Sequence, residues 1–312
     1  MDPRLRAFGE AAERAVQYQL RLRQHDGSFI WDPAIRDAYH KQAYSWSING
    51  RLAEAHRLIT WIASDMLVLA DYGGDVYKLS WLFQGCHRMG RFDVSHPVMR
   101  WILQQQKDCG GLPHFAADDR LRALATAWVG VSALYFGDLP EAERCAGWCT
   151  KLLDQPEEGR FCFQTTLDGE LLMEAMAADA QYIDLEKTGQ AYWEIGLPWM
   201  LMGRLYQATG EQRWLDYAER FFEWQRACAE DNFANVGSGK SSLAACIHFL
   251  NTGDARARNG AYAFGAFLLA TQYPEGGWRD PDEPDIPLIY IDHAAEYSIW
   301  LREIIGILGG AD

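Results

Sequence analysis

The chain has 312 residues, of which 49% are hydrophobic, so it is long enough to bury a substantial core. Its net charge of -14 opposes binding to nucleic-acid phosphates and to anionic membrane surfaces, and no apolar run approaches the length of a transmembrane helix. The 7 Cys have no regular spacing and the N-terminus lacks a signal-peptide core, which favours a cytoplasmic protein with free thiols.

Apolar periodicity predicts helices in six pairs, each an outer helix followed by an inner one. The predicted outer helices lie near 3–24, 52–68, 94–107, 139–154, 211–228 and 254–271. The predicted inner helices lie near 37–49, 76–89, 120–136, 189–208, 238–251 and 292–308. Six pairs are enough to close a ring, so we expect an all-α, (α/α)6 toroid that forms one domain over 1–312.

Glycines mark the short turns from an inner helix to the next outer helix. They stand at Gly50, Gly90, Gly137, Gly210 and Gly253, each at the end of one apolar segment and the start of another. Glycine suits these positions because the residue that follows a helix is often left-handed.

A second repeat occupies the long connections from outer to inner helices. Its best copy runs from Gln272 to Gly276-Gly277-Trp278, and weaker copies follow Gln24, Gln106 and Gln155. The glutamine can bind exposed backbone groups at a helix end, and the glycine permits a tight turn. The segment 158–186 breaks the pattern. Its alternation around Asp168-Gly169 predicts a small β-hairpin or lid, with a plain surface excursion as the alternative.

The Gln-x-x-x-Gly-x-aromatic element resembles the repeat of the squalene-cyclase and protein-prenyltransferase superfamily of α/α toroids. The acid motif of class II terpene cyclases, Asp-x-Asp-Asp, is absent, and the nearest string is Asp280-Pro281-Asp282-Glu283 in a proline-rich loop. The second half, around QAYWEIGLPWMLMGRLYQATGEQRW, also resembles sugar-active (α/α)6 proteins such as unsaturated glucuronyl hydrolases and N-acylglucosamine epimerases. The resemblance implies the fold more than a reaction.

In such a ring, the N-termini of the inner helices open at one rim, where polar side chains could form a concave site with apolar walls. Two of these helix starts are similar, Asp37-x-Tyr39-His40 and Asp75-x-Tyr77-Lys78. Asp37 and Asp75 suit the role of N-cap, whereas His40 and Lys78 could face the site or the solvent.

Two further groups are candidate acids or bases. Asp292 and Glu296 share a helix face beside His293, so Asp292 is either an N-cap or half of an acid–base pair. Glu194 lies in the aromatic stretch Gln190–Glu194, where burial would suit a general acid, and an ion pair with a neighbouring helix is the alternative.

Aromatic side chains at the helix starts could line the cavity and stabilise a cation or stack on a sugar, although such residues more often fill the core. These candidates are Tyr39, Tyr44, Trp81, Trp128, Tyr192, Trp193 and Tyr297. The string around Lys240 lacks the spacing of a nucleotide-binding loop but could hold an anion at a helix N-terminus. Cys86-His87 has no partners at metal-ligand spacing, so we predict neither a metal nor a cofactor.

Three functions remain open. The first is an enzyme for acid-initiated cyclisation or isomerisation of an apolar small molecule, with Glu194 or Asp292 as the acid. The second is a carbohydrate-active hydrolase, lyase or epimerase that uses two of Glu194, Asp292, His293 and His40; uronate substrates would require Lys78, Arg122 or Lys240 to point inward. The third is a non-catalytic binding protein.

Overall fold

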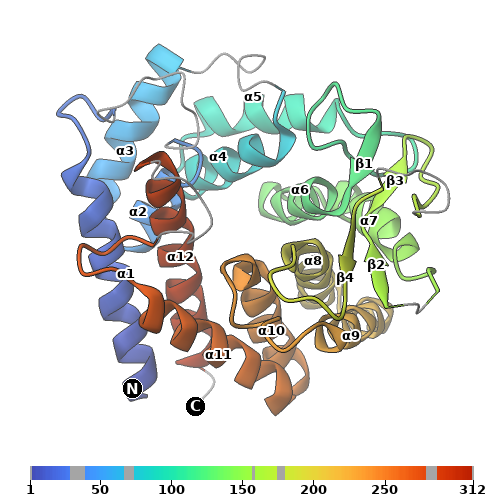
Figure 1. The fold of residues 1–312 in the computed structure, drawn as a ribbon. Helices are drawn as coiled ribbons and strands as arrows, with labels where there is room; N and C mark the ends of the chain where they lie inside the picture. Colours follow the sequence, from blue (N-terminus) through green and yellow to red (C-terminus); the bar gives the residue numbers. More distant parts are fainter. Residues whose placement is uncertain are drawn as a thin grey trace. The chain divides into compact units, whose positions relative to one another are not determined.

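The computed structural model describes residues 2–28, 39–66, 74–156, 159–173, 180–278 and 287–310, with side chains omitted at 65–66 and 287–290. Both helices of every predicted pair are present in these residues (Figure 1). The helices predicted as outer are α1 (Pro3–Arg21), α3 (Leu52–Trp61), α5 (Phe92–Leu103), α7 (Leu139–Lys151), α9 (Gln212–Ala227) and α11 (Ala255–Thr271). Those predicted as inner are α2 (Gln42–Ile48), α4 (Val76–Arg88), α6 (Ala123–Phe136), α8 (Trp193–Thr209), α10 (Gly239–Thr252) and α12 (Pro287–Leu308).

The chain divides into two compact units. The first comprises Met1–Trp101 together with Gly265–Asp312, and the second comprises Ile102–Phe264. In the first unit α12 packs against α1 and α2, and Figure 1 shows the blue α1 beside the red α12. In the second unit α8 packs against α6, α9 and α10. A single domain over 1–312 stays a prediction.

Burial separates the two kinds of helix. Every residue of α6 from Ala123 to Ala133 is buried, whereas α9 buries one face that includes Trp214, Phe221 and Phe222. Small residues allow the inner helices to approach closely, since a Cβ at Gly196 would lie 2.5 Å from the backbone nitrogen of Ser241. In the part of the chain that is described, no helix combines the length and apolarity needed to cross a membrane.

The glycines of the short turns adopt the predicted left-handed conformation. Their φ angles lie between +68° and +85° at Gly50, Gly90, Gly137, Gly210 and Gly253. The N–H of Gly210, for example, donates to the carbonyl of Tyr206, which closes the end of α8.

In three copies of this repeat, the glycine rests on the backbone of a neighbouring outer helix. A Cβ on Gly27 would lie 2.9 Å from the Arg57 carbonyl oxygen in α3. Gly110 meets the Arg144 carbonyl in α7 in the same way, and Gly276 meets the Arg14 carbonyl in α1. All three glycines have φ above +90°, so both their conformation and their surroundings exclude a side chain.

Three glutamines of this repeat, Gln106, Gln155 and Gln272, donate to backbone carbonyls, as predicted. The Nε2 atoms of Gln106 and Gln272 each donate at 3.0 Å, to the carbonyls of Gly110 and Gly276. The indole nitrogen of Trp278 donates to Leu268 at 3.0 Å and holds the loop on the end of α11. The repeat therefore fastens long connections to the outer helices.

Short strands occur at the predicted interruption, but their pairing differs from one hairpin. Strand β1 (Arg120–Arg122) pairs antiparallel with β3 (Gln164–Thr166), and Arg122 lies opposite Gln164. Strand β2 (Arg160–Cys162) pairs with β4 (Tyr182–Asp184). The Asp168-Gly169 turn is present, with a left-handed Gly169 and a bridge between Thr165 and Leu171.

Four inner helices begin elsewhere than predicted, among them α2 at Gln42 rather than 37 and α8 at Trp193 rather than 189. Helix α6 starts at Ala123 rather than 120, because Arg120-Leu121-Arg122 alternates polar and buried side chains as a strand. Helix α12 starts at Pro287 rather than 292, because proline suits the first turn of a helix.

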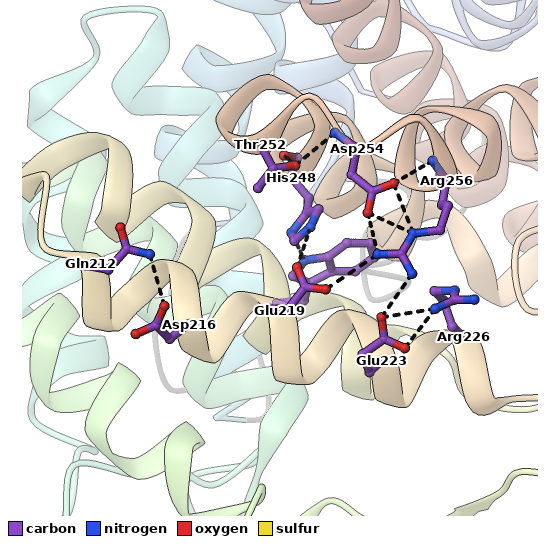
Figure 2. A network of polar contacts seen from close by, with 10 residues as sticks. Gln212, Asp216, Glu219, Glu223, Arg226, His248, Thr252, Asp254 and Arg256 are labelled. Atoms are coloured by element: carbon purple, nitrogen blue, oxygen red, sulfur yellow. Dashed lines mark hydrogen bonds and ion pairs between the residues drawn. The ribbon is translucent and has the colours of Figure 1, made fainter.

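A polar network connects α9, α10 and α11 within the second unit (Figure 2). Buried His248 accepts a hydrogen bond at Nδ1 from the Trp199 indole at 3.2 Å, and its Nε2 lies 3.1 Å from Glu219 Oε2. Arg256 binds Asp254 at 2.6 Å and approaches Glu219 at 3.7 Å. Burial and the charge of Arg256 outweigh the nearby carboxylates and lower the pKa of His248 from 6.5 to about 4.

Stability is expected to fall as the pH drops from 6.5 to about 4, because the unfolded chain takes up a proton at His248 before the folded chain does. The free energy of unfolding should decrease by up to about 3 kcal/mol, because each unit of pKa difference between the folded and unfolded chain corresponds to roughly 1.4 kcal/mol. Urea unfolding across this range measures it. His248→Asn, which keeps an acceptor for Trp199, should flatten the slope, whereas His56→Asn at an exposed position should not. An unchanged slope in His248→Asn would disprove the assignment.

Candidate functional site

A buried lysine forms the centre of a charged cluster in the first unit. Lys41 is 4% exposed, and its Nζ lies 2.6 Å from both Asp292 Oδ2 and Glu296 Oε2. His40 Nε2 lies 3.5 Å from Asp292 Oδ1. The structure thus brings His40 and Asp292 together as predicted, and adds a lysine that the sequence reasoning missed.

The charges in this cluster fix its protonation. Burial opposes the charge on Lys41, but Asp292 and Glu296 raise its pKa well above the ordinary value. Burial also opposes ionisation of Asp292, yet Lys41 and His40 outweigh it and lower its pKa. Asp292 is therefore better suited to be a base or a fixed negative charge than a proton donor.

Aromatic rings surround the cluster. The Lys41 ammonium lies 5.6 Å from the Trp81 ring centroid, and Trp81 contacts Trp300 edge to face at 5.4 Å. Tyr44 lies 6.0 Å from Trp81 and is held by Glu303 and Arg88. The other predicted residues of this unit are less central: Tyr39 stacks on Trp61 at 4.9 Å, and His293 stacks on Tyr297 at 5.3 Å.

Two of the predicted N-caps can be assessed. Asp75 caps α4 by accepting from the Lys78 N–H at 2.8 Å, and the Lys78 ammonium lies 3.6 Å from the same carboxylate. Asp292 is not an N-cap, because α12 begins before it and places it inside the helix. Asp37 and the string Asp280-Pro281-Asp282-Glu283 lie outside the described residues.

In the second unit, Glu194 is completely buried and accepts three hydrogen bonds. They come from Arg122 Nε at 2.7 Å, the Leu124 N–H at 2.8 Å and the Trp193 indole at 3.1 Å. This is the ion-pair alternative of the sequence analysis, with the partner in β1. A carboxylate held by three donors is well suited to orient its neighbours, and its role as an acid stays a prediction.

The other predicted residues of this unit differ in their surroundings. The Lys240 ammonium lies 5.8 Å from the Trp193 ring, and an anion site at the start of α10 stays a prediction. Gln190 accepts from the Asp184 N–H at 3.2 Å, and Tyr192 donates to Asp231, so both fasten loops. Trp128 is 2% exposed and belongs to the core.

A pocket of about 360 Å³ opens beside strands β1 and β3 in the second unit. Its lining is mostly polar and consists of His114, Phe115, Asp118, Asp119, Arg120, Arg122, Gln164 and Gln181. Strand β1 places Arg122 opposite Gln164 of β3, which brings both side chains to the pocket. Asp118 Oδ2 accepts from the Phe115 N–H at 2.9 Å, so a tight turn fixes this carboxylate.

Asp118 and Asp119 were not predicted as site residues, although the sequence carries a signal for them. They are the one pair of consecutive aspartates in the sequence, and they directly precede a predicted inner helix. The Asp118 carboxylate is fixed by the turn, whereas the Asp119 side chain is 89% exposed and 3.7 Å from Arg120. The pair therefore supplies one fixed and one solvent-accessible carboxylate at a pocket.

Cys86 and His87 have local surroundings that do not gather further ligands. Burial raises the pKa of the Cys86 thiol, and His87 Nδ1 lies 3.2 Å from Ser95 Oγ. Within the described ranges, no three His, Cys, Asp or Glu side chains are grouped so that they could hold a metal ion.

Comparison with known proteins identifies the fold. The chain matches no protein-family model and no curated protein by sequence. Its structure is similar to an α-1,6-mannanase of glycoside hydrolase family 76 from Salegentibacter, with a TM-score of 0.68 and 16% identity over 96% of this chain and 99% of that one. It is similar to a D-mannose isomerase, with a TM-score of 0.66 and 12% identity over 94% and 96% of the two chains.

A type II terpene cyclase from Scytonema is also similar, with a TM-score of 0.62 and 14% identity over 98% of this chain and 99% of that one. These structures are α/α toroids, so the predicted fold class is confirmed. The cyclase resemblance is one of several, and at these identities the likeness establishes the fold alone.

Proposed function

We propose that the protein is a carbohydrate-active enzyme that hydrolyses a glycosidic bond in the pocket beside β1 and β3. The observation that carries the proposal is the pair Asp118-Asp119 in a polar pocket with His114, Arg122 and Gln164. Sugars present many hydroxyl groups, which need donors and acceptors rather than apolar walls. The lining of this pocket offers both, and it is mostly polar.

Glycoside hydrolysis generally uses two carboxyl groups, one of which protonates the leaving oxygen while the other acts at the anomeric carbon, directly or through a water molecule. We assign the second role to Asp118, because its position is fixed by the Phe115 N–H. Asp119 takes the first role, because it is the other carboxyl group of the pair and lines the same pocket. His114 and Gln164 then bind substrate hydroxyls at the same pocket.

The comparisons support this choice. Inactive variants of the Salegentibacter mannanase, solved with α-1,6-linked mannose oligosaccharides, have two consecutive aspartates replaced. The present sequence contains one such pair, and it lies at a pocket. A glucuronyl hydrolase and a mannose isomerase among the similar structures also act on sugars.

Asp118→Asn and Asp119→Asn are each expected to reduce hydrolysis of unactivated oligosaccharides by a factor on the order of 100 or more, because a positioned acid or base contributes about that much. Release of reducing sugar from α- and β-linked mannose, glucose and galactose oligosaccharides measures the effect. Aryl glycosides with a good leaving group separate the two roles. Asp119→Asn should retain turnover on them, since their departure requires no proton, whereas Asp118→Asn should not.

Asp168→Asn is the matched control, because Asp168 is an exposed turn aspartate in the same unit and does not line this pocket. It should leave turnover unchanged. Full activity of both Asp118→Asn and Asp119→Asn, or no hydrolysis by the wild type across the panel, would contradict the proposal.

Acid-initiated cyclisation is the second candidate, and the aromatic rings around Asp292 and Glu296 favour it. The lowered pKa of Asp292 counts against its service as the initiating acid. Cyclisation requires the opposite mutational pattern. Asp292→Asn or Glu296→Gln would lose turnover of a linear polyprenyl substrate, whereas Asp118→Asn would keep it.

A further inference from the structure

Arg122 is held at the pocket by a buried partner. Its Nε donates to Glu194 Oε1 at 2.7 Å, and its guanidinium carbon lies 5.3 Å from the Phe163 ring centroid. Among the residues that the structure describes, this is the one hydrogen bond that the Arg122 side chain makes, and the side chain is 22% exposed. The two terminal nitrogens, Nη1 and Nη2, thus remain available as donors at a pocket that Arg122 lines.

Glu194 fixes the guanidinium before any ligand binds. Its carboxylate is itself held by the Leu124 N–H and the Trp193 indole, so it cannot turn away from Arg122 without breaking two further hydrogen bonds. A guanidinium fixed in one plane loses little conformational entropy when it binds a pair of oxygens. The geometry matches two oxygens side by side, as in a carboxylate or in two adjacent hydroxyl groups.

The charge of the surroundings decides between these ligands. Glu194 already matches the charge of Arg122 at 2.7 Å, and the Asp118 carboxylate lines the same pocket. A ligand carboxylate at Arg122 would be repelled by Glu194 and Asp118, whereas neutral hydroxyls would be bound without that repulsion.

We propose that Arg122 is a specificity-determining residue that binds two adjacent hydroxyl groups of a neutral sugar, and that Glu194 is its positioning residue. This inference rests on the proposed function for the location of the sugar. It names the substrate class as a neutral hexose with vicinal hydroxyls, and it excludes uronic acids from the same position.

Calorimetric binding of S-linked disaccharides tests the proposal, because these analogues bind without being cleaved. The panel contains the mannose, glucose and galactose compounds, their single deoxy derivatives and a uronate counterpart of each. The wild type is expected to bind one neutral compound at least about tenfold more tightly than its uronate counterpart. Removal of either of two adjacent hydroxyls should weaken binding about tenfold in the wild type, but should have no effect in Arg122→Met.

Arg122→Lys keeps the charge but loses the paired donors, so it should bind like Arg122→Met. Arg122→Met leaves Glu194 buried without its cation, so the variant could fail to fold. The double variant Arg122→Met/Glu194→Gln removes that charge. It should regain the thermal stability of the wild type but not its affinity, which separates a role in binding from a purely structural one.

Two results would overturn the proposal: equal sensitivity to deoxygenation in the wild type and Arg122→Met, or tighter binding of the uronate than of the neutral sugar. Failure of the proposed function is distinguishable. Binding with the expected pattern but without hydrolysis would refute hydrolysis and leave Arg122 as assigned. Hydrolysis that depends on Asp119 while binding is unaffected in Arg122→Met would refute the role of Arg122 alone.

Discussion

Lys41→Met is expected to destabilise the protein by about 3–5 kcal/mol, the usual cost when one member of a buried ion pair is removed. The ammonium of Lys41 lies 2.6 Å from each of two carboxylates, and the side chains of Lys41, Asp292 and Glu296 are between 5% and 20% exposed. Without the lysine, Asp292 and Glu296 would face each other as like charges with little access to water. Urea unfolding at neutral pH measures the loss.

A neutralised variant provides the control for this result. Lys41→Met combined with Asp292→Asn and Glu296→Gln removes all three charges at nearly constant volume, so most of the lost stability should return. If Lys41→Met alone costs less than about 1 kcal/mol, the cluster behaves like a surface ion pair and the interpretation is wrong.

Gly110→Ala and Gly276→Ala are expected to cost about 3 kcal/mol or more each, the sum of a left-handed backbone and a steric overlap. Both glycines have φ above +90°, and a Cβ at either position would overlap the carbonyl oxygen of Arg144 or Arg14 in an adjacent outer helix. A backbone carbonyl cannot move aside as a flexible side chain can. Thermal or urea unfolding of the purified variants gives the values.

Gly90→Ala isolates the backbone contribution. Gly90 has φ of +68°, and within the described residues a Cβ there would meet nothing within 4 Å. This variant should cost only about 1 kcal/mol, so the difference from Gly110→Ala measures the contact with the neighbouring helix. Equal losses at Gly90 and Gly110 would refute the role of that contact.

The helices were predictable because their signals are local. A glycine after an apolar helical segment, as at Gly137 or Gly253, indicates the end of a helix without knowledge of its neighbours, and both glycines are left-handed in the structure. Helix starts were less certain. Helix α12 begins at Pro287, five residues before the predicted start. Strand β1 has only three residues, so its alternation of polar and buried side chains is too short to be distinguished from the start of α6 in the sequence.

The candidate site was only partly predictable, because it depends on partners far apart in the chain. His40 and Asp292 were chosen from their helix positions, but Lys41 has a role only because Asp292 and Glu296 come to it from another helix. Glu194 was recognised as a buried carboxylate, and its partner Arg122 lies 72 positions away. Asp118-Asp119 lies in a loop, where helical periodicity gives no information, so its pocket became visible only in three dimensions.

The pairing of α1 with α12 has a consequence for synthesis on the ribosome. The second unit, Ile102–Phe264, is a continuous stretch of chain, so its helices can assemble as soon as that stretch has emerged. The first unit combines residues up to Trp101 with residues from Gly265 onward, so α1 must wait for α12 while the whole second unit is translated. The nascent chain therefore exposes the apolar face of α1 for most of its elongation.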